Sequence, residues 1–192
     1  MNDIQVQGDV APGFESLKVL FTQQMLTLAE ENAQLCVYHR GEKVVDLWAS
    51  TPGNDSFSGD SLVNIFSSGK SLEAIAIGTL VSQGLVDYDA RITQYWPEFG
   101  AKGKEGVTVA DLMRHEAGLA NFDTSLDAED LFTENIKKNA VGQVIEQHGL
   151  SYSSGGKREY HAITRGWVVN ELFRRVDPEG RTIGEFLRQE IT

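Results

Sequence analysis

The feature that most constrains this chain is an apolar segment between residues 62 and 84. From Ser67 to Gln83, apolar side chains recur at the spacing of one helix face, and Gly84 follows as a helix terminator. The first turn of this predicted helix carries Ser67 and, three residues later, Lys70. Residues three apart lie on the same face of a helix, so the hydroxyl and the amine can come within hydrogen-bonding distance. The sequence therefore predicts a helix that presents a paired serine and lysine at its N-terminal end.

Spacing alone leaves two interpretations of this pair open. Ser67 could cap the helix while Lys70 points into solvent. Ser67 could instead be a nucleophile, because backbone N–H groups and the positive end of the dipole at a helix start stabilise an oxyanion. Ser154 and Lys157 have the same spacing, but they lie in a glycine-rich turn that cannot keep helical geometry, and we discount them.

The rest of the chain predicts an α+β fold in which helices predominate. An amphipathic helix over residues 13–31 precedes two strands over residues 34–39 and 43–49, joined by a turn that contains Gly41. Further helices are predicted over residues 109–113, 133–148, 162–175 and 183–191, with Thr108 and Thr182 at the starts of two of them.

Composition excludes several classes of function. The net charge of -11 opposes binding to nucleic acid or to anionic membrane surfaces. No apolar run is long enough to span a bilayer and the N-terminus does not resemble a secretory signal, so we expect a cytoplasmic protein. Cys36 is the single cysteine and lies in an apolar run, where we expect it to be buried as a small hydrophobic residue.

Three segments carry a specific pattern in a specific order. Residues 64–70 read Asn-Ile-Phe-Ser-Ser-Gly-Lys, residues 84–89 read Gly-Leu-Val-Asp-Tyr-Asp, and residues 107–119 end in His-Glu-Ala-Gly-Leu. Together they resemble the class C beta-lactamase-like serine hydrolases, which include family VIII carboxylesterases, D-alanyl-D-alanine carboxypeptidases and penicillin-binding proteins. The resemblance implies a beta-lactamase/transpeptidase-like fold: an antiparallel sheet flanked by helices, plus a mostly helical subdomain.

The resemblance also implies the roles of individual residues. Ser67 would be the nucleophile, and Lys70 and Tyr160 would move its proton. Ala162 stands where the beta-lactamases of this superfamily have an asparagine that contacts the substrate amide, which favours ester cleavage over lactam hydrolysis. His161 could partly replace that asparagine, whereas His115 resembles a structural residue that supports the active-site wall. No metal or organic cofactor is implied.

The third motif of the superfamily, a short strand that contains lysine or histidine, has no candidate among residues 161–192. We therefore expect residues 1–192 to form an incomplete domain with little or no activity alone. Its expected parts are residues 1–86 with the nucleophile helix, residues 87–149 as the helical subdomain, and residues 150–192 with the tyrosine motif. The missing C-terminal strands would leave a sheet edge open to self-association or to a partner chain.

The function predicted from these observations is hydrolysis of small carboxylic esters or amides through an acyl-enzyme on Ser67. Two alternatives stay open. One is a penicillin-recognising carboxypeptidase or beta-lactamase, and the other is a non-catalytic member with a binding or structural role.

Overall fold

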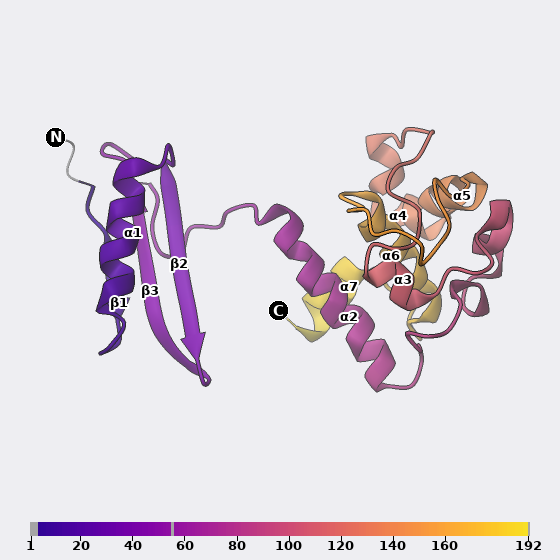
Figure 1. The fold of residues 1–192 in the computed structure, drawn as a ribbon, viewed down its shortest axis with the longest axis horizontal. Helices are drawn as coiled ribbons and strands as arrows, with labels where there is room; N and C mark the ends of the chain where they lie inside the picture. Colours follow the sequence, from indigo (N-terminus) through magenta and orange to yellow (C-terminus); the bar gives the residue numbers. More distant parts are fainter. Residues whose placement is uncertain (1–3, 55, 192) are drawn as a thin grey trace. The chain divides into compact units, whose positions relative to one another are not determined.

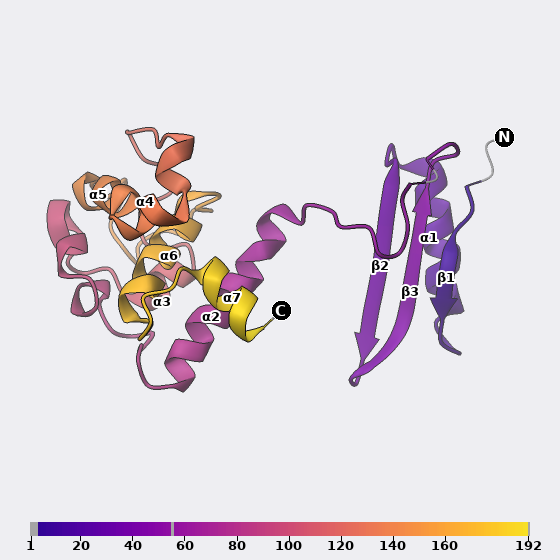
Figure 2. The same cartoon turned by 180° about the vertical axis from the view of Figure 1, so that it is seen from behind.

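The computed structural model describes residues 4–54 and 56–191, so residues 1–3, Asp55 and Thr192 lie outside the description. The chain forms two compact units, Met1–Asn64 and Ile65–Thr192 (Figures 1 and 2). The boundaries that we expect from the sequence, at residues 86 and 149, stay a prediction.

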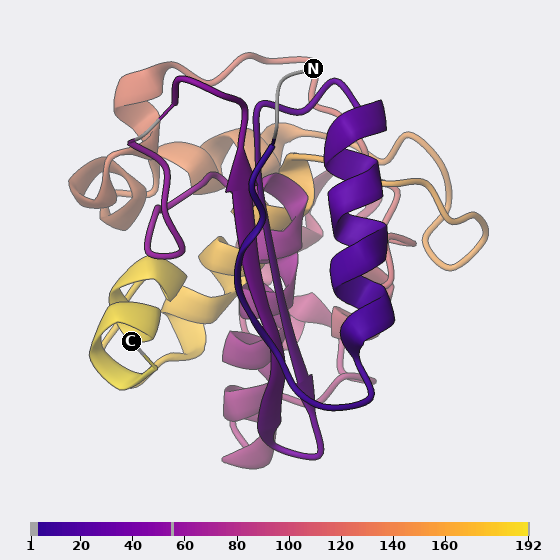
Figure 3. The same ribbon diagram turned by 90° about the vertical axis from the view of Figure 1, so that its left-hand side faces the viewer.

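The first unit is a three-stranded antiparallel sheet with one helix along it. Its elements are β1 (Gln7–Val10), α1 (Glu15–Thr27), β2 (Asn32–His39) and β3 (Glu42–Ser50). The strand order is β1-β3-β2, so β3 is central, and Figure 3 shows α1 running alongside the strands. The sequence predicted only β2 and β3. It missed β1 because a four-residue stretch with glycine and aspartate has low strand propensity, and the stretch is extended through its pairing with β3.

The predicted hairpin between β2 and β3 is confirmed. Its turn residues Arg40 and Gly41 both have positive φ angles, 53° and 84°, as in the tight turns that match strand twist. The covered face of the sheet packs against Phe21 and Met25 of α1.

The expectation that Cys36 is buried is wrong, because this residue is exposed. Leu35 and Val37, its neighbours in β2, pack against the core of the first unit. Side chains alternate between the two faces of a strand, so Cys36 points away from that core. An apolar run in the sequence does not show which face of a strand is covered.

The second unit is helical among the residues that the structure describes. Its helices are α2 (Lys70–Ser82), α3 (Val109–Met113), α4 (Thr133–Lys137), α5 (Ala140–Gln147), α6 (Thr164–Val176) and α7 (Ile183–Glu190). Short 3₁₀ helices are η1 (Phe66–Gly69), η2 (Ile92–Gln94), η3 (Pro97–Gly103) and η4 (Ala128–Leu131). The predicted caps are confirmed, since Thr108 and Thr182 each form a capping box at the start of α3 and α7.

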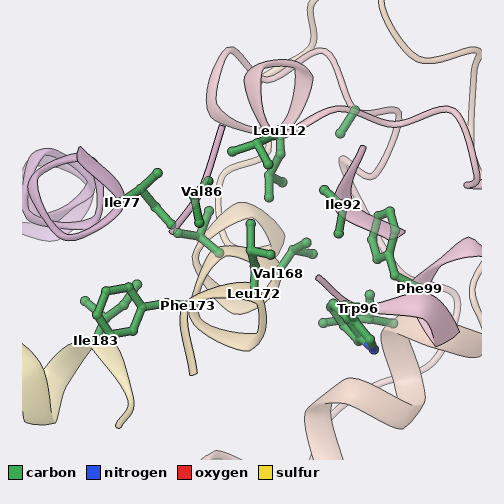
Figure 4. Packing of buried hydrophobic residues seen from close by; sticks show 14 of the residues in the cluster. Ile77, Val86, Ile92, Trp96, Phe99, Leu112, Val168, Leu172, Phe173 and Ile183 are labelled. Atoms are coloured by element: carbon green, nitrogen blue, oxygen red, sulfur yellow. The ribbon is translucent and has the colours of Figure 1, made fainter. Parts of the chain in front are cut away.

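Helix α6 lies at the centre of the core of this unit. Figure 4 shows Val168 and Leu172 of α6 in one cluster with Ile77 of α2 and Leu112 of α3, and all four side chains are fully buried. This packing holds α2, which begins at Lys70, against α6, which follows Tyr160. The positions of these two helices determine where the residues of the site lie.

The prediction of a single helix over residues 133–148 is wrong. Asn139 has a left-handed backbone (φ 72°) between α4 and α5, and its side-chain oxygen accepts hydrogen bonds from Arg174 and Arg175 of α6 at 2.9 and 2.5 Å. Asparagine tolerates this conformation better than most residues. A contact with a distant helix thus interrupts a sequence whose periodicity is helical.

Within the described residues, none of the helices combines the length and the apolar character that crossing a membrane requires.

Candidate active site

Ser67 lies in η1, the 3₁₀ helix that directly precedes α2, and it is exposed. A 3₁₀ helix has three residues per turn, so side chains three apart are eclipsed. Lys70 is therefore directly in line with Ser67, and its Nζ donates a hydrogen bond to Ser67 Oγ at 3.1 Å. No side-chain cap is formed at the start of η1 or of α2, so Ser67 is not a capping residue.

The backbone just before the serine has an unusual conformation. Phe66 has a φ angle of 44°, in the left-handed region that a bulky side chain rarely adopts. A residue held there costs on the order of 1–3 kcal/mol, and such conformations cluster at functional sites.

Lys70 joins two parts of the second unit. Its Nζ also donates to the carbonyl oxygen of Ala162 at 2.6 Å, just before α6 begins at Thr164. The same nitrogen lies 5.2 Å from the centre of the Tyr160 ring. The lysine thus connects the serine turn with the tyrosine segment.

Tyr160 completes the group of three residues that the sequence analysis singled out. Hydrogen bonding to the Ser67 hydroxyl, followed by hydrogen bonding to Lys70, lowers the pKa of the Tyr160 phenol, and burial opposes this only in part. Its side chain is 54% exposed, so the hydroxyl can meet a ligand from solvent. The structure brings Tyr160 close to the turn of Ser67 and Lys70, from which it is separated by at least 90 positions in the sequence.

The expectation that His161 could take the place of the missing asparagine is wrong. His161 is fully buried, and its Nε2 accepts the backbone N–H of Leu119 at 2.9 Å. Its Nδ1 lies 2.5 Å from the carbonyl oxygen of Glu159, which makes Nδ1 the protonated nitrogen. Burial lowers its pKa, so the ring stays neutral and faces the core rather than a substrate.

An ion pair that sequence reasoning missed lies one helical turn beyond Lys70. Glu73 Oε2 is 3.4 Å from Arg165 Nη1, and the two side chains are 20% and 6% exposed. Burial raises the pKa of Glu73, while the charges of Arg165 and Lys70 lower it. The sequence contains one signal of this pair, an acidic residue three positions after Lys70 in an otherwise apolar helix. Its partner, Arg165, lies in α6, and the sequence pattern does not indicate that contact.

A hollow of about 410 Å³ adjoins the site at Ala162. Its lining is largely apolar: Ala120, Asn121, Phe122, Thr124, Ser125, Leu126, Ala162, Ile163, Thr164 and Trp167. The rings of Phe122 and Trp167 stack with their centres 6.0 Å apart. An asparagine in place of Ala162 would add a polar side chain to this lining.

The second serine–lysine pair is not a site, as the sequence analysis expected. Ser154 Oγ donates to Asp111 Oδ2 at 3.0 Å, and Lys157 is paired with Glu159 at 2.6 Å. Among residues 4–54 and 56–191, histidine, cysteine and acidic side chains form no cluster of three or more that could hold a metal ion.

Comparison with known proteins identifies the family of this chain. The family described as "Beta-lactamase" matches residues 19–192. The esterase/beta-lactamase LipL of Mycobacterium tuberculosis is 36% identical over 190 residues, which are 97% of this chain and 42% of LipL.

Solved structures show the same relationship. A family VIII carboxylesterase has 31% identity and a TM-score of 0.83 over 94% of this chain and 49% of its own. A penicillin-binding protein homolog from Caulobacter crescentus has 32% identity and a TM-score of 0.83 over 97% and 50%. EstA from Arthrobacter nitroguajacolicus Rue61a has 34% identity and a TM-score of 0.81 over 96% and 47%.

The chain therefore belongs to the beta-lactamase family and has its beta-lactamase/transpeptidase-like fold, as the sequence motifs predicted. It spans less than half of LipL and about half of each of these solved structures.

Proposed function

We propose that this chain carries the acylation machinery of a serine hydrolase that cleaves carboxylic esters. The observation that carries the proposal is the hydrogen bond of 3.1 Å from Lys70 Nζ to Ser67 Oγ, with the Tyr160 ring centred 5.2 Å from the same nitrogen. A hydroxyl bonded to an amine, with a phenol of lowered pKa nearby, has a route by which its proton can leave.

In the proposed reaction, Ser67 Oγ attacks the ester carbonyl while its proton passes to Tyr160, with Lys70 stabilising the phenolate. The tetrahedral intermediate expels the alcohol, which takes a proton back from the tyrosine. Water then attacks the acyl-enzyme with the same tyrosine as base, and the carboxylic acid and free Ser67 are released. Backbone N–H groups at the start of α2 would bind the oxyanion.

The hollow at Ala162 supports esters over penicillins as substrates. It offers an apolar lining next to the carbonyl that Lys70 contacts, which suits the hydrocarbon part of a small ester. Its lining presents the Ala162 methyl where an asparagine would offer an amide to a lactam side chain. The carboxypeptidase or beta-lactamase alternative and the non-catalytic alternative remain the competing proposals.

Labelling by a fluorophosphonate probe, followed by intact mass, tests the nucleophile. We expect the wild-type chain to be labelled and Ser67→Ala to be unlabelled. Ser68→Ala is the matched control, because Ser68 is an exposed serine of the same turn. Retained labelling of Ser67→Ala would refute the assignment. Labelling by a fluorescent penicillin would favour the carboxypeptidase alternative, and no reaction with either probe would favour a non-catalytic role.

The two serine–lysine pairs allow a test of the lysine as well. Lys70→Met should slow labelling about 100-fold or more, because the proton of Ser67 then lacks its route. Lys157→Met should label at the wild-type rate, since Lys157 is exposed and its Nζ contacts Glu159 and the Tyr152 ring. Equal rates for the two variants would contradict the proposed role of Lys70.

A further inference from the structure

His115 binds the segment that carries Tyr160 through two hydrogen-bond acceptors, its backbone carbonyl oxygen and its side-chain Nδ1. It lies just beyond α3 with a φ angle of 63°, which is uncommon for a residue other than glycine. Its carbonyl oxygen accepts the N–H of Glu159 at 3.0 Å. Its Nδ1 accepts the N–H of His161, also at 3.0 Å. The residues on both sides of Tyr160 are thus bonded to the same histidine.

The imidazole also contacts the tyrosine itself. The ring centres of His115 and Tyr160 are 4.9 Å apart with an angle of 52° between the planes. Because Tyr160 is 54% exposed, burial alone constrains it weakly. The two backbone bonds and the ring contact therefore help to fix this residue.

The bond from His161 N–H requires a neutral imidazole with its proton on Nε2, since Nδ1 must offer a lone pair. Burial, followed by the charge of Arg165, lowers the pKa of His115 to about 4. His161, Lys70 and Arg158 add to this effect. The acceptor at Nδ1 is consequently present throughout the neutral pH range.

We propose that His115 is a positioning residue: by bonding the backbone on both sides of Tyr160, it holds the phenol against Ser67 and Lys70. The proposal rests on the proposed function of Tyr160 as the base for Ser67. His115 acts through the tyrosine and takes no proton in the reaction.

Three substitutions separate the contributions of the imidazole. His115→Asn keeps a side-chain acceptor and tolerates the left-handed backbone, but it removes the ring. His115→Phe keeps a ring and removes the acceptor, and His115→Ala removes both. The backbone carbonyl that binds Glu159 is present in all three.

The readout is the pKa of Tyr160 itself, measured by NMR on chain labelled with ¹³C at tyrosine Cζ and assigned with Tyr160→Phe. In the wild type we expect a value below the usual value of about 10. His115→Asn should keep most of this lowering. His115→Phe and His115→Ala should raise the pKa back toward about 10, because the hydroxyl then leaves Ser67 and Lys70.

The proposal is overturned if His115→Ala leaves the Tyr160 titration unchanged, or if His115→Asn loses the lowering completely. If the Phe and Ala variants do not fold, as judged by circular dichroism, the Asn variant still tests the proposal, because a complete loss of the lowering in that variant overturns it. The titration needs no turnover. A histidine-dependent Tyr160 pKa without fluorophosphonate labelling of Ser67 would therefore refute the proposed function and leave the positioning role supported.

Discussion

At the scale of single residues, the proposed reaction depends on the protonation of the Tyr160 phenol. The hydroxyl of Ser67 and then the amine of Lys70 lower the pKa of Tyr160, because both stabilise its charged form. A base acts in its deprotonated form, so the rate of Ser67 labelling should rise with pH through the Tyr160 pKa. The midpoint should lie below the usual phenol value of about 10.

Tyr160→Phe should remove this pH dependence and slow labelling by about 100-fold or more. Tyr152→Phe is the control, because Tyr152 lies in the same connection between α5 and α6, and burial raises its pKa instead. A pH profile that survives in Tyr160→Phe would show that another group is the base.

At the scale of elements, the segment that carries Tyr160 is held by close backbone approach to the segment after α3. Gly118 has a φ angle of 76°, and a Cβ there would lie 2.3 Å from the carbonyl oxygen of Tyr152. Gly103 has a similar φ angle of 85°, but a Cβ there would meet nothing within 4 Å. The two glycines share the conformational requirement and differ only in the space around them.

Gly118→Ala should therefore destabilise the chain by about 1–3 kcal/mol more than Gly103→Ala, since only the first substitution adds a steric clash to the backbone strain. Urea unfolding at neutral pH measures both. Equal losses would mean that the segment after Gly118 can shift without cost.

Helix α6 is anchored by a charge network that periodicity could not reveal. Glu171 has a side chain that is 0% exposed, and it pairs with Arg174 at 2.7 Å and with Arg175 at 2.6 Å. Both arginines also bond to Asn139, the residue that separates α4 from α5. The contacts of the two arginines with Asn139 therefore both interrupt the predicted helix over residues 133–148 and hold α6 in place.

Glu171→Gln should lower the free energy of unfolding by about 3 kcal/mol, because two partly buried guanidinium groups would lose their counter-charge. Glu179→Gln should change it by less than about 1 kcal/mol, since Glu179 is 67% exposed and 3.6 Å from Arg181. Chemical denaturation followed by tryptophan fluorescence compares the two, and similar effects would contradict a stabilising role for the buried network.

At the scale of the whole molecule, the net charge and the edge of the sheet have opposite effects on self-association. Strand β2 is at one edge of the order β1-β3-β2 within the described residues, and its Tyr38 is 65% exposed. Edge strands can pair with other chains, whereas a net charge of -11 makes copies of this chain repel each other. Self-association at this edge remains a prediction.

Sedimentation velocity should show more association at about 0.5 M salt than at about 0.05 M, because salt screens the repulsion. Tyr38→Lys should reduce that association by placing a charge on the edge strand, while Tyr88→Lys, in the other unit, should not. A chain that stays monomeric at both salt concentrations would argue against self-pairing at β2.

The sequence by itself determined the family, the helix that follows Ser67, the hairpin and two helix caps, because motifs, periodicity and capping are local properties of the chain. It also predicted which serine, lysine and tyrosine would meet. Only the tertiary structure decided that His161 faces the core, that Cys36 is exposed, that β1 is a strand, and that His115 lies against Tyr160. Each of these depends on contacts between residues far apart in the chain, and a one-dimensional pattern does not specify such contacts.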